Sequence, residues 1–237
     1  MSQKARDDIL RFFVPYNRLT DLLPLYSFSG VSEPLFYLPV IEQYMDYLRN
    51  VIEKDILKTR GWAKVYTNGT RLNKARILKL RDLGIDEVRV NPSASGFSES
   101  VYHSIDMAAK VLPVVTVEVP AWPPYRKRLF DMLPIIDRCG VSHLDICQVE
   151  VMNQEGLERI SQAFPDAEFY QGHWLMLDDG GMVEDIMREV LEKGYAYSVI
   201  DCNAFVKQVY HNPWMKQCLH RFCDTRAAGD VYAAAER

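Results

Sequence analysis

The sequence has no long hydrophobic run, no excess of positive charge and few cysteines. No apolar stretch reaches the ~18 to 20 residues that a membrane-spanning helix needs, and the first residues lack the apolar region of a secretory signal peptide. The formal net charge of −4 gives no general attraction to nucleic acid or to an anionic membrane surface. The five cysteines are odd in number and scattered, which argues against a disulfide framework. We therefore expect a cytoplasmic protein with reduced thiols that binds neither nucleic acid nor membrane.

One pattern is present three times: a helical apolar stripe, then a glycine, then a run of β-branched or aromatic residues. The three glycines are Gly84, Gly140 and Gly194. Glycine suits the left-handed position that closes a helix, because it has no Cβ. A helix that leads directly into a strand is half of a βαβ unit. The 237-residue chain is therefore predicted to be an α/β protein with parallel strands and one large core.

Hydrophobic periodicity predicts seven strands, at 25–29, 62–67, 87–91, 114–119, 143–149, 167–171 and 195–201. The predicted helices between them cover 36–58, 73–83, 98–111, 125–138, 154–164 and 183–193. An amphipathic helix over 3–13 comes first, and no strand precedes it. Because a complete barrel of this kind has eight strands, we expect a partial or open (β/α) barrel over residues 1–203. Residues 204–237 are predicted to form a helical or irregular tail.

Polar residues gather where the predicted strands end, whereas the opposite ends are mostly glycine and apolar turns. Parallel α/β proteins bind ligands at the carboxyl ends of their strands. This asymmetry favours a ligand pocket over a purely structural barrel. The candidate pocket residues are Gly30, Ser32, Glu33, Thr67, Asn68, Asn91, Ser93, Glu118, Gln148, Glu150, His173, Asp201 and Asn203.

The first two strand ends carry a resemblance. Residues 29–35 read S-G-V-S-E-P-L and resemble the G-x-G-E-P-L turn after the second strand of radical S-adenosylmethionine (SAM) enzymes. Residues 65–72 read V-Y-T-N-G-T-R-L and resemble the third strand of that family, which often ends in T-N-G. Residues 80–91 and 117–120 are similar to its next strands. The resemblance spans roughly residues 25–203.

The resemblance implies a SAM site across these strand ends. In the family, the backbone of the first turn binds the amino group of the methionine moiety. Gly30, Ser32 and Glu33 would then lie at the methionine end, while Thr67, Asn68, Asn91 and Ser93 would line the adenosine side. Glu118 would be a further cofactor residue that holds a SAM hydroxyl or accepts a proton. Gln148, Glu150, His173, Asp201 and Asn203 would face an unknown small-molecule or peptide substrate. A complete family member cleaves SAM reductively, and the resulting 5′-deoxyadenosyl radical abstracts a hydrogen atom from the substrate.

The sequence departs from the family in two places. Ser32 replaces the second glycine of the turn, and the C-x-x-x-C-x-x-C loop that holds a [4Fe–4S] cluster is absent. The cluster is therefore expected only if a missing N-terminal region is supplied, and we expect the chain to be a fragment that is inactive alone. Cys202, Cys218 and Cys223 do not have a recognised zinc spacing, so the sequence predicts no metal site.

Two other interpretations remain open. The chain could be a cluster-less SAM-barrel relative that acts as a binding or partner subunit, with another chain pairing at the exposed edge strand over 25–29. It could instead be an unrelated barrel lyase or isomerase that uses Glu118, Glu150 and His173 for proton transfer. Binding of SAM would separate the SAM-related interpretations from the last one.

Overall fold

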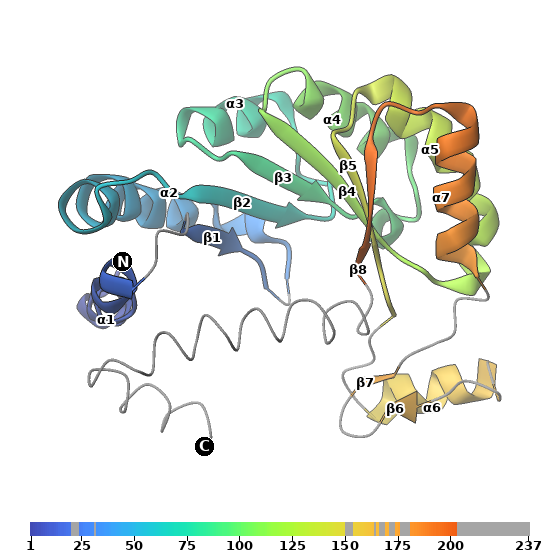
Figure 1. Cartoon of the computed structure of the whole chain (residues 1–237), viewed down its shortest axis with the longest axis horizontal. Coiled ribbons are helices and arrows are strands. Elements are labelled where there is room, and N and C mark those ends of the chain that lie inside the picture. Colours follow the sequence, from blue (N-terminus) through green and yellow to red (C-terminus); the bar gives the residue numbers. More distant parts are fainter. Residues whose placement is uncertain are drawn as a thin grey trace.

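The computed structural model describes residues 1–19, 24–30, 32–149, 154–163, 165, 169–170, 174–175 and 181–202. Within these residues, six strands form one sheet in which each strand pairs in parallel with the next along the sheet (Figure 1). They are β1 (Leu25–Phe28), β2 (Trp62–Thr67), β3 (Glu87–Val90), β4 (Val114–Pro120), β5 (His143–Cys147) and β8 (Ser198–Cys202). In this part of the chain β1 and β8 are the two edges and do not pair with each other. The prediction of an α/β protein with an open parallel barrel is confirmed.

The helices follow the predicted order. They are α1 (Gln3–Leu19), α2 (Leu38–Tyr47), the π-helix η2 (Leu48–Leu57), α3 (Lys74–Asp82), α4 (Glu99–Ala109), α5 (Arg126–Cys139), α6 (Gln154–Ala163) and α7 (Met182–Lys193). Short 3₁₀ turns follow three strands: η1 (Pro34–Tyr37), η3 (Pro92–Ser95) and η4 (Pro123–Tyr125). Gly84, Gly140 and Gly194 end α3, α5 and α7 with positive φ, as the repeated pattern predicts.

The two faces of the sheet differ in chemistry. Helices α3, α4, α5 and α7 lie along one side of it (Figure 1). Strand residues on that side are apolar and buried: Ala63, Val65, Val88, Val90, Val115, Val117, Val119, Leu144 and Ile146. Because successive side chains of a strand alternate between faces, the residues between these point the other way. Those residues are mostly polar, and we call their side of the sheet the polar face.

The predicted barrel strand over 167–171 is wrong. Phe169–Tyr170 (β6) pairs antiparallel with Trp174–Leu175 (β7) in a separate two-stranded sheet. Two short aromatic runs separated by three residues that include Gly172 are typical of a hairpin, and this signal outweighs the strand periodicity. Strand β8 therefore pairs directly with β5.

Two further expectations concern the C-terminal tail and membrane-spanning helices. The predicted tail over 204–237 lies outside the described residues, so it stays a prediction. None of the helices in the described ranges combines the length with the apolar character that crossing a membrane requires.

Candidate functional site

The carboxylate of Glu33 joins the turns that follow β1 and β2. Its Oε1 accepts hydrogen bonds from the backbone N–H of Leu35 (3.1 Å) and the hydroxyl of Thr67 (2.7 Å). Its Oε2 accepts from the backbone N–H of Asn68 (2.7 Å). Glu33 and Thr67 are both buried. These three bonds fix the turn that contains Gly30 and Ser32 beside the T-N-G turn, which are the two turns that carry the resemblance.

The turn after β3 lies next to the turn after β2. The backbone N–H of Asn91 donates to the carbonyl of Thr67 (2.9 Å). The side-chain oxygen of Asn91 accepts from the N–H (3.0 Å) and the hydroxyl (2.6 Å) of Ser93, and so begins η3. Similarly, Oδ1 of Asn68 accepts from the N–H and hydroxyl of Thr70. Three neighbouring turns at the carboxyl edge of the sheet are thus held by their own polar side chains.

The predicted cofactor residues therefore divide into two groups. The side chains of Glu33, Thr67 and Asn91 hold the turns in place by hydrogen bonds within the chain. Gly30 and Ser32 are exposed. A Cβ built on Gly30 would have no atom of the described chain within 4 Å, so the described residues leave that side of the turn open. What these turns offer a ligand is mainly backbone, and direct ligand contact by any of the predicted residues stays a prediction.

Arg89 is at the centre of the polar face. Its Nε donates to Glu87 (2.7 Å) on the same strand, and its Nη1 contacts Glu118 of β4 (3.1 Å) and Asp145 of β5 (2.6 Å). Glu87 also accepts from the hydroxyl of Thr116 (2.7 Å). One guanidinium thus connects carboxylates from three neighbouring strands. Glu118, one of the predicted cofactor residues, thus pairs with Arg89.

This network shifts the pKa values of its members. Burial alone lowers the pKa of Arg89, but the charge of Glu87 and the other nearby acids hold it above its usual value. Burial alone raises the pKa of Glu87, but the hydrogen bond from Thr116 and the charge of Arg89 hold it below its usual value. Burial and the charge of Arg89 lower the pKa of Lys64, whereas burial raises the pKa of Tyr66 to about 12. Arg89 and Glu87 therefore stay charged at neutral pH.

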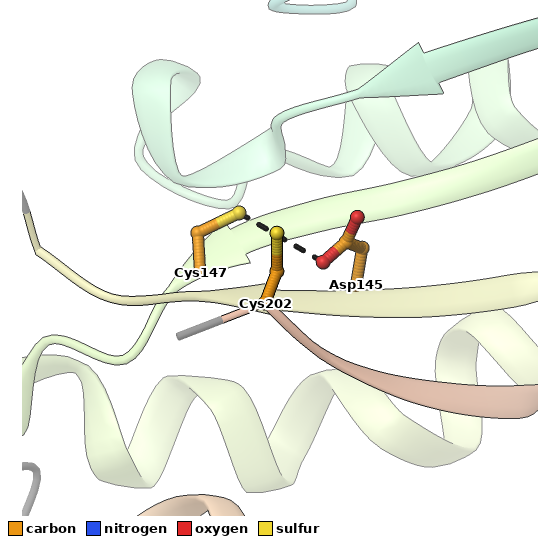
Figure 2. Close-up of side chains that lie close together, drawn as sticks. All are labelled: Asp145, Cys147 and Cys202. Atoms are coloured by element: carbon orange, nitrogen blue, oxygen red, sulfur yellow. Dashed lines mark hydrogen bonds between the residues drawn. The ribbon is translucent and has the colours of Figure 1, made fainter. Parts of the chain in front are cut away.

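At the carboxyl ends of β5 and β8, three potential metal ligands lie together. One ligand atom each from Asp145, Cys147 and Cys202 lies within 4.8 Å of the other two. Figure 2 shows the two thiols and the carboxylate side by side on the neighbouring strands. The Sγ of Cys147 donates to Oδ1 of Asp145 (3.8 Å). The hydrogen bond with Cys202 and burial both raise the pKa of the Cys147 thiol.

The predicted substrate residues are placed differently. Gln148 directly follows β5 and is partly buried. Asp201 is in register with Ile146, which lies on the helix-covered face, so Asp201 is on the opposite side of the sheet from Cys202. Glu150, His173 and Asn203 lie outside the described residues, so their proposed roles stay predictions.

The polar face itself is not among the features predicted from the sequence. Charged and polar residues occupy alternate positions in otherwise apolar strands: Lys64 and Tyr66, Glu87 and Arg89, Thr116 and Glu118, and Asp145 and Cys147. Two-residue alternation within a strand indicates that one face is polar, and this signal was available in the sequence. Strand ends alone do not identify these residues, because most of them lie within the strands.

Comparison with solved structures gives the class of this fold. The chain aligns with anSMEcpe, a radical SAM enzyme, in a structure with bound AdoMet (S-adenosylmethionine): TM-score 0.55, 14% identity, covering 82% of this chain and 54% of the other. The same protein with bound AdoMet and Cp18Cys peptide gives a TM-score of 0.56 and 12% identity, covering 82% and 55%. The chain therefore shares its fold with part of this radical SAM enzyme, as the sequence resemblance implies.

The structural similarity covers only part of those proteins. The chain spans about half the length of the solved structures that it matches. No protein-family model and no curated protein matches the sequence.

The cysteines do not fit the cluster that such a fold usually holds. No three of the five cysteines have the C-x-x-x-C-x-x-C spacing. Among the described residues, Cys139 lies at the end of α5, on the helix side, while Cys147 and Cys202 are on β5 and β8. Three closely placed thiolates for a [4Fe–4S] cluster are thus missing from the described part of the chain.

Proposed function

We propose that this chain binds SAM at the carboxyl edge of β1 to β4. The observation that carries the proposal is the Glu33 bridge, which fixes the S-G-V-S-E-P-L turn beside the T-N-G turn. The likeness in fold to structures that contain bound AdoMet supports it. Binding at this edge also agrees with the general position of ligands in parallel α/β proteins.

Specific groups would bind each part of the ligand. The exposed backbone around Gly30 and Ser32 offers carbonyl and N–H groups to the ammonium and carboxylate of the methionine moiety. The backbone of the turns after β2 and β3, at Asn68 and Ser93, would line the adenosine side. Glu118, fixed by Arg89, would accept a hydrogen bond from a ribose hydroxyl. The role of Glu33 is then to position the first two turns.

The proposal is limited to binding and orientation of SAM. When bound beside a [4Fe–4S] cluster, SAM supplies the radical chemistry, and the barrel orients and shields it. Because the thiols of this chain do not fit that cluster, reductive cleavage would require a form of the protein that carries the three-cysteine motif. A small molecule or a peptide would then meet the polar face on the side of β5 and β8.

Gly30→Trp tests the SAM site. Because no described residue fills the space beside Gly30, the fold should accommodate the indole, which should occupy the volume proposed for the methionine moiety. Without an iron to chelate the amino and carboxylate groups, we expect a dissociation constant of about 100 μM or weaker, equivalent to roughly 5 to 6 kcal/mol at most. Calorimetry should detect SAM binding to the wild type and at least about tenfold weaker binding to the variant.

The matched control is Ala196→Trp, which adds the same indole at an exposed position before β8, on the opposite edge of the sheet. This control should bind SAM like the wild type. If the wild type gives no heat at millimolar SAM, or if Gly30→Trp binds SAM as well as the control does, the proposed site is wrong.

The edge strand β1 favours a second candidate function, in which the chain is a binding subunit. Leu25 on this strand is 57% exposed, and Phe36 and Tyr37 nearby are each 56% exposed. An edge with exposed apolar side chains is a natural site for another chain to pair, and a second copy is the simplest partner. Light scattering should then show dimers that Leu25→Lys dissociates. The exposed Leu191 of α7 provides the matched control, Leu191→Lys, and a monomeric wild type would rule out self-pairing.

A further inference from the structure

Cys147 and Cys202 are 55 residues apart in the sequence but are direct partners across two parallel strands. The Cα of Cys147 is in register with that of Cys202, so both side chains point to the polar face. Asp145 lies two residues before Cys147 on β5 and therefore on the same face. Figure 2 shows the resulting group, in which two sulfur atoms and one carboxylate oxygen lie close together.

The spacing of these atoms is close to that of ligands of one metal ion. Tetrahedral zinc has Zn–S distances of about 2.3 Å and Zn–O distances of about 2.0–2.2 Å, which place a sulfur about 3.6 Å from an oxygen and about 3.8 Å from another sulfur. Here the Sγ of Cys147 is 3.8 Å from Oδ1 of Asp145. All three ligand atoms lie within 4.8 Å of one another. No pair of these atoms therefore exceeds its tetrahedral separation by more than about 1.2 Å.

The neighbouring side chains suit a bound cation. Arg89 holds the other carboxylate oxygen, Oδ2 of Asp145, at 2.6 Å, and so directs Oδ1 toward the thiols. An outer group of this kind orients a metal ligand, although the positive charge of Arg89 itself opposes a cation on the same carboxylate. The buried side chain of Asp145 and the partly buried thiols limit competition from water. A soft cation prefers thiolates, which selects zinc over magnesium or calcium.

We propose that Asp145, Cys147 and Cys202 form a binding site for a single thiophilic divalent cation such as Zn²⁺. Three protein ligands leave the fourth tetrahedral position open to water or to a group of a substrate, as in catalytic zinc sites. This site differs from a [4Fe–4S] cluster site, because both sulfurs would bind the same single ion, whereas a cluster needs three cysteines that each bind a different iron. The proposal stands whether or not the chain binds SAM, which is proposed for the β1 to β4 side of the same edge.

Cobalt substitution tests this site on the full chain under reducing conditions. Co²⁺ bound by two thiolates should produce thiolate-to-metal charge transfer in the ultraviolet and visible bands typical of a tetrahedral ion, at one equivalent. Zn²⁺ should displace it. Cys147→Ser and Cys202→Ser should each weaken Zn²⁺ binding more than about 100-fold. This loss exceeds the 10- to 100-fold effect of mutating a residue that only hydrogen-bonds to a metal ligand. Arg89→Met removes both the orientation of Oδ1 and an opposing positive charge, so it should change Zn²⁺ binding less than either cysteine variant does.

Three controls separate this site from other thiols. Cys139→Ser changes a partly buried thiol on α5 that contacts the carbonyl of Tyr102, and it should leave binding unchanged. Cys218→Ser and Cys223→Ser should also bind like the wild type. Circular dichroism checks that each variant folds. Tight binding that survives loss of both Cys147 and Cys202 would overturn the proposal, as would a reduced wild type that binds no Co²⁺ or Zn²⁺. Neither result would affect the calorimetric test of SAM binding.

Discussion

Replacing Glu33 with alanine removes the link between the first two turns of the carboxyl edge. The buried carboxylate accepts three hydrogen bonds, from Leu35, Thr67 and Asn68. Alanine leaves all three donors without this partner and leaves the space of the carboxylate empty. We expect a large loss of stability from this one substitution, together with weaker SAM binding, because the Gly30 turn loses its fixed position.

The size of the loss follows from the three bonds. A hydrogen bond to a charged group contributes about 1.5–3 kcal/mol, so three independent bonds would bound the loss at about 4.5–9 kcal/mol. The three are not independent, because they share one carboxylate, and the N–H of Asn68 is partly buried and can be reached by water. The expected decrease in the free energy of unfolding is therefore about 3–4 kcal/mol.

Urea unfolding followed by circular dichroism measures this decrease, with the m-value as a check that the denatured state is unchanged. Glu42→Ala is the matched control. Its carboxylate forms a partly exposed ion pair with Lys79, which contributes less than about 1 kcal/mol. If Glu33→Ala and Glu42→Ala lower the free energy of unfolding equally, the Glu33 bridge does not hold the two turns.

Two further predictions concern the same sheet. Gly69→Ala should lower the free energy of unfolding by about 2–4 kcal/mol, because Gly69 has φ +79° and an added Cβ would meet Val101 at 2.6 Å. The control is Gly96→Ala. Gly96 has φ +69°, but no described atom lies within 4 Å of an added Cβ, so the loss should be only about 1–2 kcal/mol. Equal losses would contradict the packing argument. For Glu87, the folded-state pKa lies below its usual value of 4.5, so its stabilising contribution is full above pH 4.5 and is lost as the pH falls through the folded-state pKa. Glu87→Gln should therefore flatten the pH dependence of unfolding below pH 4.5, and an unchanged slope in urea titrations would contradict this.

Most of the main sheet could be predicted from the sequence because its signals are local and agree with one another. Glycine at the end of α3 or α5, followed at once by β-branched residues, defines both the helix end and the next strand. The segment over 167–171 fails for the opposite reason. Its aromatic residues are too few for periodicity to distinguish a barrel strand from a two-residue hairpin strand.

The site could be predicted only in part. The G-x-x-E-P turn and the T-N-G turn are each a continuous stretch of sequence directly after a predicted strand. Their positions at the carboxyl edge therefore follow from the predicted strands. Their internal hydrogen bonds do not, because the bond between Glu33 and Thr67 joins residues 34 positions apart. The pairing of Cys147 with Cys202 depends on which strands are neighbours, and a barrel strand over 167–171 would have separated them.

Arg89 links the proposed SAM site and the proposed cation site electrostatically. Its Nη1 contacts Glu118 and Asp145 together, so the two carboxylates share one positive charge. A cation bound to Oδ1 of Asp145 would weaken the attraction of that carboxylate for Arg89, and the guanidinium would then pair more strongly with Glu118. The oxygen of Glu118 proposed to accept a ribose hydroxyl would become a poorer acceptor, and the cation would also repel the positive sulfonium of SAM. Both effects would weaken the binding of SAM. Because coupling between two binding sites is reciprocal, SAM would oppose binding of the cation by the same factor.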